Sequence, residues 1–131
     1  GDEVMRVARA ATPATAGPVQ AAQRDVRLPG KLYRTFDEPA PETILKMSTL
    51  KIGPVVFAGV SGEIFSEIGM AVKAQSPYPS TLFLGCTNGY NSYVPTEKAY
   101  PLKGYEVRVS RIMRGGEAAI VRSLSDLINT F

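Results

Sequence analysis

Histidine is absent from the 131-residue sequence. Catalytic arrangements that pair a serine or cysteine nucleophile with an imidazole base are therefore excluded within this chain. Metal sites built on imidazole nitrogen are excluded for the same reason. Whatever chemistry the chain supplies must come from other side chains.

Cysteine occurs once, as Cys86. A single cysteine rules out an intramolecular disulfide and a CxxC zinc knuckle. Because it directly follows the apolar run 83–85, we expect Cys86 to be a small buried hydrophobic residue rather than a reactive thiol.

Long hydrophobic runs are also missing. The longest near-continuous one, 52–60, is interrupted by Gly53, Pro54 and Gly59, so no segment is expected to span a bilayer. No signal-peptide pattern opens the chain, and it begins with Gly1 rather than Met, which indicates a processed or trimmed product. A hydrophobic content of 44% is ordinary for one globular domain with a core and too high for intrinsic disorder.

The net charge is small, at +3, and the basic residues are scattered. Arg108, Arg111 and Arg114 lie three positions apart and could form a modest basic edge. A nucleic-acid-binding protein usually shows a denser basic stripe with interleaved aromatic residues. We therefore expect a solvated face here and no nucleic-acid partner.

The N-terminal third predicts a loosely attached start followed by strands. Residues 1–20 suggest a short helix from Asp2 to Ala11 and a linker, and residues 21–131 suggest the folded core. Alternating apolar residues from 26 to 36 predict a half-exposed strand interrupted at Pro29 and Gly30. The acids and prolines of 37–42 predict a surface loop.

The middle of the chain predicts a β-hairpin and then a βαβ unit. A Gly53-Pro54 turn joins two apolar runs, and the second, 55–60, is apolar on both faces, as in a buried strand. A helical stripe follows, with Ser61 as a plausible N-cap and Glu63 in the first turn. Residues 81–86 predict a second buried strand, parallel to the first.

This topology has a consequence for chemistry. The segments that leave the two parallel strands, 61–63 and 87–90, must emerge at the same edge of the sheet, where such folds place ligands. Glu63 and the Asn88–Tyr90 loop are thereby expected to lie together. Further along, 107–112 predicts an edge strand, and the stripe after Gly116 predicts a final core helix. The expected class is α+β, a mixed sheet with a central βαβ unit and flanking helices.

Two sets of residues could carry chemistry, and each has a structural alternative. Glu63 could be a hard oxygen ligand or an acid–base group, or a carboxylate that only favours a helix N-terminus. The tyrosines that follow could donate to an oxyanion or bind a metal as phenolates, or could merely pack their rings and bond backbone carbonyls. Composition alone does not choose between these.

The pattern of these residues resembles the neutral/alkaline ceramidases, a family of zinc-dependent amidases. The resemblance rests on Gly62-Glu63 after a buried strand, on the run 85–96 with its Asn-x-Tyr-x-x-Tyr core, and on Tyr100 and Tyr105. These last two stand seven and twelve positions after Tyr93, as in the family. Several matches in order make the signal more specific than a single short motif.

The resemblance implies roles for individual residues. Glu63 and Tyr93 match two zinc ligands of the family, and Tyr105 matches a tyrosine that hydrogen-bonds the tetrahedral intermediate of amide hydrolysis. Asn88 and Tyr90 are expected to shape the substrate pocket. The family's two histidine ligands and its catalytic serine have no match here, so the chain resembles the C-terminal portion of such a hydrolase, part of a larger catalytic domain and inactive alone.

The same resemblance implies a lipid-amide substrate, the rest of the hydrolase as partner, and a secreted, periplasmic or membrane-peripheral location. Two alternatives remain open. One is a non-catalytic α+β binding or assembly module that uses the tyrosine loop and the basic edge to meet a partner or anionic lipid. The other is a degenerate relative without the metal. If the chain is a fragment of a larger sheet, an open strand edge near Val26 or Val107 is a hazard for self-association.

Overall fold

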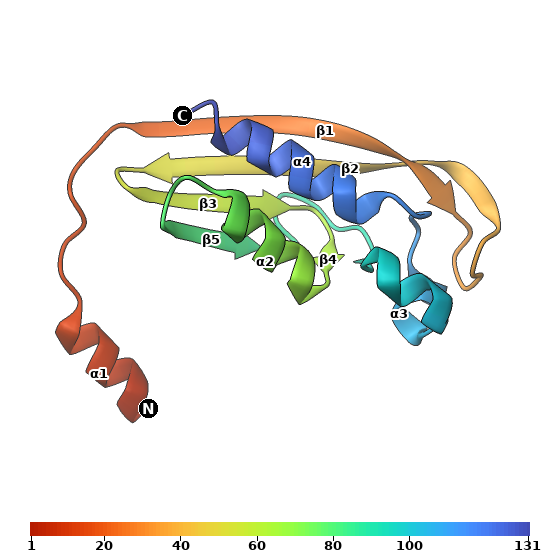
Figure 1. The fold of residues 1–131 in the computed structure, drawn as a ribbon, viewed down its shortest axis with the longest axis horizontal. Helices are drawn as coiled ribbons and strands as arrows, with labels where there is room; N and C mark the ends of the chain where they lie inside the picture. Colours follow the sequence, from red (N-terminus) through yellow and green to blue (C-terminus); the bar gives the residue numbers. More distant parts are fainter.

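The computed structural model describes all residues, 1–131. Its main sheet has four strands in the order β1-β2-β3-β5, where β5 runs parallel to β3 and the other neighbours are antiparallel (Figure 1). The strands are β1 (Val19–Lys31), β2 (Pro39–Ile52), β3 (Val55–Val60) and β5 (Ser80–Leu84). The predicted hairpin, the parallel βαβ unit and the α+β class are confirmed.

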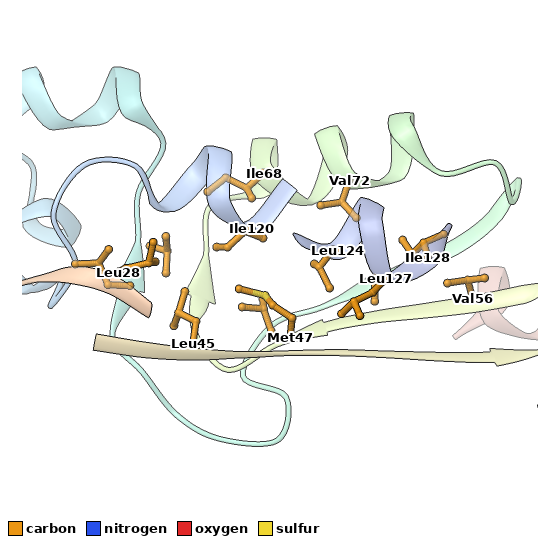
Figure 2. Packing of buried hydrophobic residues seen from close by; sticks show 14 residues of the cluster. Leu28, Leu45, Met47, Val56, Ile68, Val72, Ile120, Leu124, Leu127 and Ile128 are labelled. Carbon is orange, nitrogen blue, oxygen red and sulfur yellow. The ribbon is translucent and has the colours of Figure 1, made fainter. Parts of the chain in front are cut away.

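Two helices, α2 (Ser66–Gln75) and α4 (Gly116–Ile128), cover one face of this sheet. Figure 2 shows the side chains of both helices pointing onto those of β2 and β3 to form the hydrophobic core. The core residues that it labels on the helices and strands are Ile68, Val72, Ile120, Leu124, Leu127, Ile128, Leu28, Leu45, Met47 and Val56. The predicted apolar stripe of the last helix is therefore the side that packs on the sheet.

The loop predicted at 37–42 is wrong in part, because Pro39 already begins β2. Pro39 lies at the first strand position, and Pro41 lies in the register shift between the Leu28 and Gly30 pairings. Neither position requires a ladder N–H, so both prolines are tolerated in the strand. Gly30 is required there, since a Cβ on it would lie 1.7 Å from the carbonyl oxygen of Pro41.

The helix predicted to start after Ser61 begins later, at Ser66, with Phe65 as its N-cap. Ser61 does not cap it, because its Oγ accepts the Lys46 N–H at 2.8 Å. Glu63 is consequently not in a first helical turn. It lies in a two-residue strand, β4 (Glu63–Ile64), which pairs in parallel with β6 (Tyr93–Val94).

The edge strand predicted at 107–112 is also wrong. Residues Tyr105–Val109 form one helical segment, α3, closed by bonds such as that from Ser110 N–H to the Glu106 carbonyl at 2.9 Å. Val107 and Val109 are buried all the same. A short alternation of apolar residues does not distinguish a strand from a helical turn whose neighbours cover two sides of it.

The buried position predicted for Cys86 is contradicted, because its side chain is exposed. β5 is the edge of the sheet and ends at Leu84, so Cys86 falls in the turn beyond it, where its backbone adopts a left-handed φ of 50°. Leu82 and Leu84 are themselves exposed, so β5 is not the buried strand that its apolar sequence predicts.

The N-terminal helix α1 (Asp2–Ala10) is exposed along its whole length and lies apart from the sheet, at the end of the 11–18 linker (Figure 1). This agrees with the predicted helix and linker. No helix of the chain is long and apolar enough to cross a membrane.

A reciprocal pair of carboxylates joins α4 to the 3-10 helix η1 (Glu97–Leu102). The Glu97 Oε1 accepts the Gly115 N–H at 2.6 Å, and the Glu117 Oε2 accepts the Glu97 N–H at 2.6 Å. Each helix start thus receives a carboxylate from the other, which satisfies donors that helix geometry leaves free.

We expect Glu97→Ala to lower the free energy of unfolding by about 1–2 kcal/mol, as for loss of a helix cap with a charged acceptor. Urea unfolding measures this change. Glu97→Gln keeps an acceptor oxygen and should lose less than Glu97→Ala, whereas equal losses in the two variants would contradict a role for the bond to Gly115.

Candidate functional site

The carboxyl ends of the parallel strands β3 and β5 meet at one edge of the sheet, as the topology predicts. The turn that follows β5 folds back on the chain that follows β3. The Thr87 N–H donates to the Val60 carbonyl, and the Cys86 N–H donates to the Gly62 carbonyl, both at 2.9 Å. The 85–92 loop then leads directly into β6.

The short ladder between β4 and β6 places Glu63 opposite Tyr93. Directly paired residues of neighbouring strands point to the same face, so the carboxylate and the phenol lie side by side. The pKa of Tyr93 is raised above its ordinary value. The main cause is a hydrogen bond to Glu63, followed by burial and by the charges of Glu63, Tyr105 and Glu106. The carboxylate therefore stabilises the neutral phenol, and a cation held between the two would have the opposite effect.

Tyr105 lies at the start of α3, and its ring meets the ring of Tyr93 edge to face, with centroids 6.2 Å apart and planes at 73°. Tyr105 is 59% exposed, and no hydrogen bond within the chain occupies its hydroxyl. Three of the residues singled out in the sequence, Glu63, Tyr93 and Tyr105, are thus brought together.

Tyr100, the other tyrosine of the family spacing, is a core residue. Its hydroxyl donates to the carbonyls of Ile112 and Met113, each at 3.1 Å, and its side chain is buried. Burial raises its pKa to about 12. It anchors η1 to the segment before α4 and presents nothing to the ladder.

Asn88 and Tyr90 are placed differently from the three ladder residues. The Asn88 Nδ2 donates to the Ser48 Oγ at 2.9 Å, on the face of the sheet opposite the helices. Tyr90 is 76% exposed. No hydrogen bond, ion pair or aromatic contact links either residue to Glu63, Tyr93 or Tyr105, so their predicted role in shaping a substrate pocket stays a prediction.

Residues that support the ladder were missed by sequence reasoning. The Ser92 Oγ accepts the Arg111 N–H at 2.8 Å, while its carbonyl accepts the Glu63 N–H at 3.3 Å. The Asn91 Nδ2 donates to the Ile44 carbonyl at 2.9 Å. The small polar residues between Tyr90 and Tyr93 were the available signal, because such residues fix loops through side-chain to backbone bonds.

Glu63 and Tyr93 supply two adjacent oxygen donors, a set that zinc accepts. Within the 131 residues no group of three or more histidine, cysteine or acidic side chains is placed to hold a metal. A zinc site that used this pair would need further ligands.

No protein-family model matches the sequence, and the search of the curated proteins finds no match. Solved structures do match. The neutral ceramidase of Pseudomonas aeruginosa superposes with a TM-score of 0.55 and 26% identity, over 66% of this chain and 15% of the ceramidase. The chain resembles a segment of neutral ceramidase. A structure of ceramidase complexed with C2 gives the same TM-score and identity, over 66% of this chain and 14% of the ceramidase.

The likeness to ceramidase confirms the resemblance that the sequence pattern indicates. The chain spans only 14–15% of the length of the ceramidases that it matches. The activity, substrate and partners of a whole ceramidase are therefore proposals for this chain.

Proposed function

We propose that this chain is the C-terminal part of the catalytic domain of a zinc-dependent amidohydrolase that resembles neutral ceramidase and cleaves the amide bond of N-acylated sphingoid lipids. The observation that carries this proposal is the Glu63–Tyr93 pair with Tyr105 beside it, in a fold that matches a ceramidase segment. The 26% identity over the matched part supports it.

In this proposal Glu63 and Tyr93 hold the zinc ion, together with ligands from the rest of the protein. Bound zinc supplies a Lewis acid for the amide carbonyl and for water. Glu63 contributes negative charge, and Tyr93 gives up its phenolic proton when it serves as a ligand. The Tyr105 hydroxyl donates a hydrogen bond to the oxygen on which negative charge develops.

Two protein ligands are fewer than the three that catalytic zinc sites usually have. We therefore expect the isolated chain to bind zinc weakly and to be inactive.

A second candidate function is an assembly module that binds a partner or anionic lipid through the tyrosine loop and the arginine edge. The exposed Tyr90 favours it. Two of the three arginines are already engaged on aromatic rings, however: Arg111 lies 5.1 Å from the centre of the Tyr33 ring and Arg114 lies 5.3 Å from that of Tyr100. Both guanidinium groups keep their charge, but a ring orients each of them and covers one of its faces.

Metal removal tests the proposed function. We expect the complete protein to contain one zinc per chain and to hydrolyse an N-acyl sphingosine. A zinc chelator should abolish hydrolysis, and added zinc should restore it. The matched control is the 131-residue chain, which should show neither tight zinc binding nor hydrolysis. Full activity in the metal-depleted complete protein would contradict the proposal.

A further inference from the structure

The face of the sheet opposite α2 and α4 is uncovered. Strand pairing identifies its residues, because directly paired residues share a face. Leu50 pairs with Phe57 and with Ala21, and Phe57 pairs with Leu82. With their neighbours two positions along, the apolar residues of this open face are Val19, Ala21, Ile44, Leu50, Ile52, Val55, Phe57, Leu82 and Leu84.

No other element of the chain covers the open face. α1 is exposed throughout, and α3 packs on β6. Val19, Ile52 and Leu82 are accordingly 68%, 45% and 45% exposed. Over the length of β3, four strands spaced about 4.8 Å apart make an area of about 19 by 20 Å. This is the size of the largest apolar patch on a typical monomer, and such patches are often functional.

The surface of the open face has a shape into which another layer of side chains can pack. A hollow of about 550 Å³ lies over it. Small residues such as Ala21, Ser48 and Gly59 and larger ones such as Leu50 and Phe57 line this hollow. Side chains of two facing sheets interdigitate in this way, knob into hollow, across about 10 Å.

Charge divides the open face along its strands. Around the hollow it carries no ionised side chain, whereas toward the other end of β1 and β2 it carries Asp25, Lys46 and Arg27, which pairs with Glu42 at 3.5 Å. The uncharged part is the part that a covering layer can bury without leaving an ion unpaired.

We propose that the open face packs against a second β-sheet supplied by the remainder of the hydrolase chain, so that the two sheets and their outer helices form four layers. This inference rests on the proposed function, since it requires the larger chain. The matched ceramidases are about seven times as long as the segment that this chain covers in them, which provides ample chain for such a sheet.

The proposed interface reaches the candidate site. The Thr87 side chain lies over Gly59 at the end of the open face, since a Cβ on Gly59 would come within 2.7 Å of it. Asn88 holds Ser48 on the same face. A covering sheet would therefore press on the 85–92 loop that positions Tyr93, and Asn88 would act as an anchor of this loop.

Cysteine labelling in the complete protein tests this packing. In a background with Cys86→Ser, Ala21→Cys places a thiol on the open face, and Ala74→Cys places one on the exposed side of α2 as a matched control. We expect a water-soluble maleimide to label position 21 at least 100-fold more slowly than position 74 in the native protein, and equally fast in denaturant. Leu50→Cys provides a second position should Ala21→Cys fail to fold.

Three results would overturn the proposal. Equal native labelling rates would show that the face is open to water. Protection that disappears on dilution would assign the face to a second copy of the chain, and protection that requires lipid vesicles or detergent would assign it to lipid. Zinc content and amide hydrolysis are measured on the same samples, so protection without zinc or activity separates failure of the proposed function from failure of the packing.

Discussion

Replacement of Glu63 by glutamine is expected to lower the zinc affinity of the complete protein by at least about 100-fold, more than loss of a residue that only supports a ligand. Hydrolysis of the lipid amide should fall in parallel. The substitution keeps the size of the side chain and removes its charge, and Glu63 is exposed in a strand held by backbone bonds, so the fold should persist. Metal analysis of the purified variant measures the loss of zinc, and circular dichroism shows whether the fold persists.

Glu67 provides the matched control for this prediction. It is exposed on α2 and forms an ion pair with Lys98 at 3.1 Å. Glu67→Gln should therefore retain zinc and activity, whereas Tyr93→Phe should lose both, like Glu63→Gln. Full zinc occupancy in Glu63→Gln and Tyr93→Phe would remove the basis for a metal site at this edge.

The meeting of Glu63 with the tyrosine segment could be predicted because it follows from topology rather than from local detail. Two apolar runs separated by a helical stripe require a crossover, and a crossover places both strand ends at one edge. The prediction that Glu63 and Asn88–Tyr90 share this edge depended on nothing else. The structure moves Glu63 from a helix to a strand, and its partner there is Tyr93 rather than the predicted Asn88 or Tyr90.

The short elements around the site could not be predicted, because distant residues define them. β4 exists only through its pairing with β6, thirty positions later in the sequence. Ser61 does not cap the helix, because its Oγ accepts the N–H of Lys46, which lies on another strand. Local patterns contain no record of such partners, and for elements of two to five residues the partners decide the conformation.

The two tyrosines after Tyr93 show the same limit for function. Tyr100 and Tyr105 are equally consistent with the family spacing, yet one bonds carbonyls in the core and the other is 59% exposed beside the ladder.

Lys31 is a further case: it is buried, and its Nζ donates to the carbonyls of Thr35 at 2.6 Å and Arg108 at 3.2 Å. Lysine in a strand is normally exposed, so the sequence alone predicts a solvated charge at this position.

The difference between Tyr100 and Tyr105 leads to the second large effect. We expect Tyr105→Phe in the complete protein to lower kcat for amide hydrolysis by about 10²–10³-fold, or about 3–4 kcal/mol, the loss typical of one oxyanion donor. The ring and its edge-to-face contact with Tyr93 remain, and the hydroxyl is not a proposed ligand. Zinc content should therefore stay at the level of the unmodified protein, which separates this variant from Glu63→Gln.

Tyr100→Phe removes the corresponding hydroxyl from the core, and it should affect stability rather than catalysis. It leaves the Ile112 and Met113 carbonyls without this donor, so the free energy of unfolding should fall by about 1–2 kcal/mol while kcat stays nearly unchanged. Urea unfolding and steady-state kinetics of the two variants give the comparison. If Tyr105→Phe instead lost zinc together with activity, its hydroxyl would belong to the metal site, and the oxyanion donor would have to come from another residue.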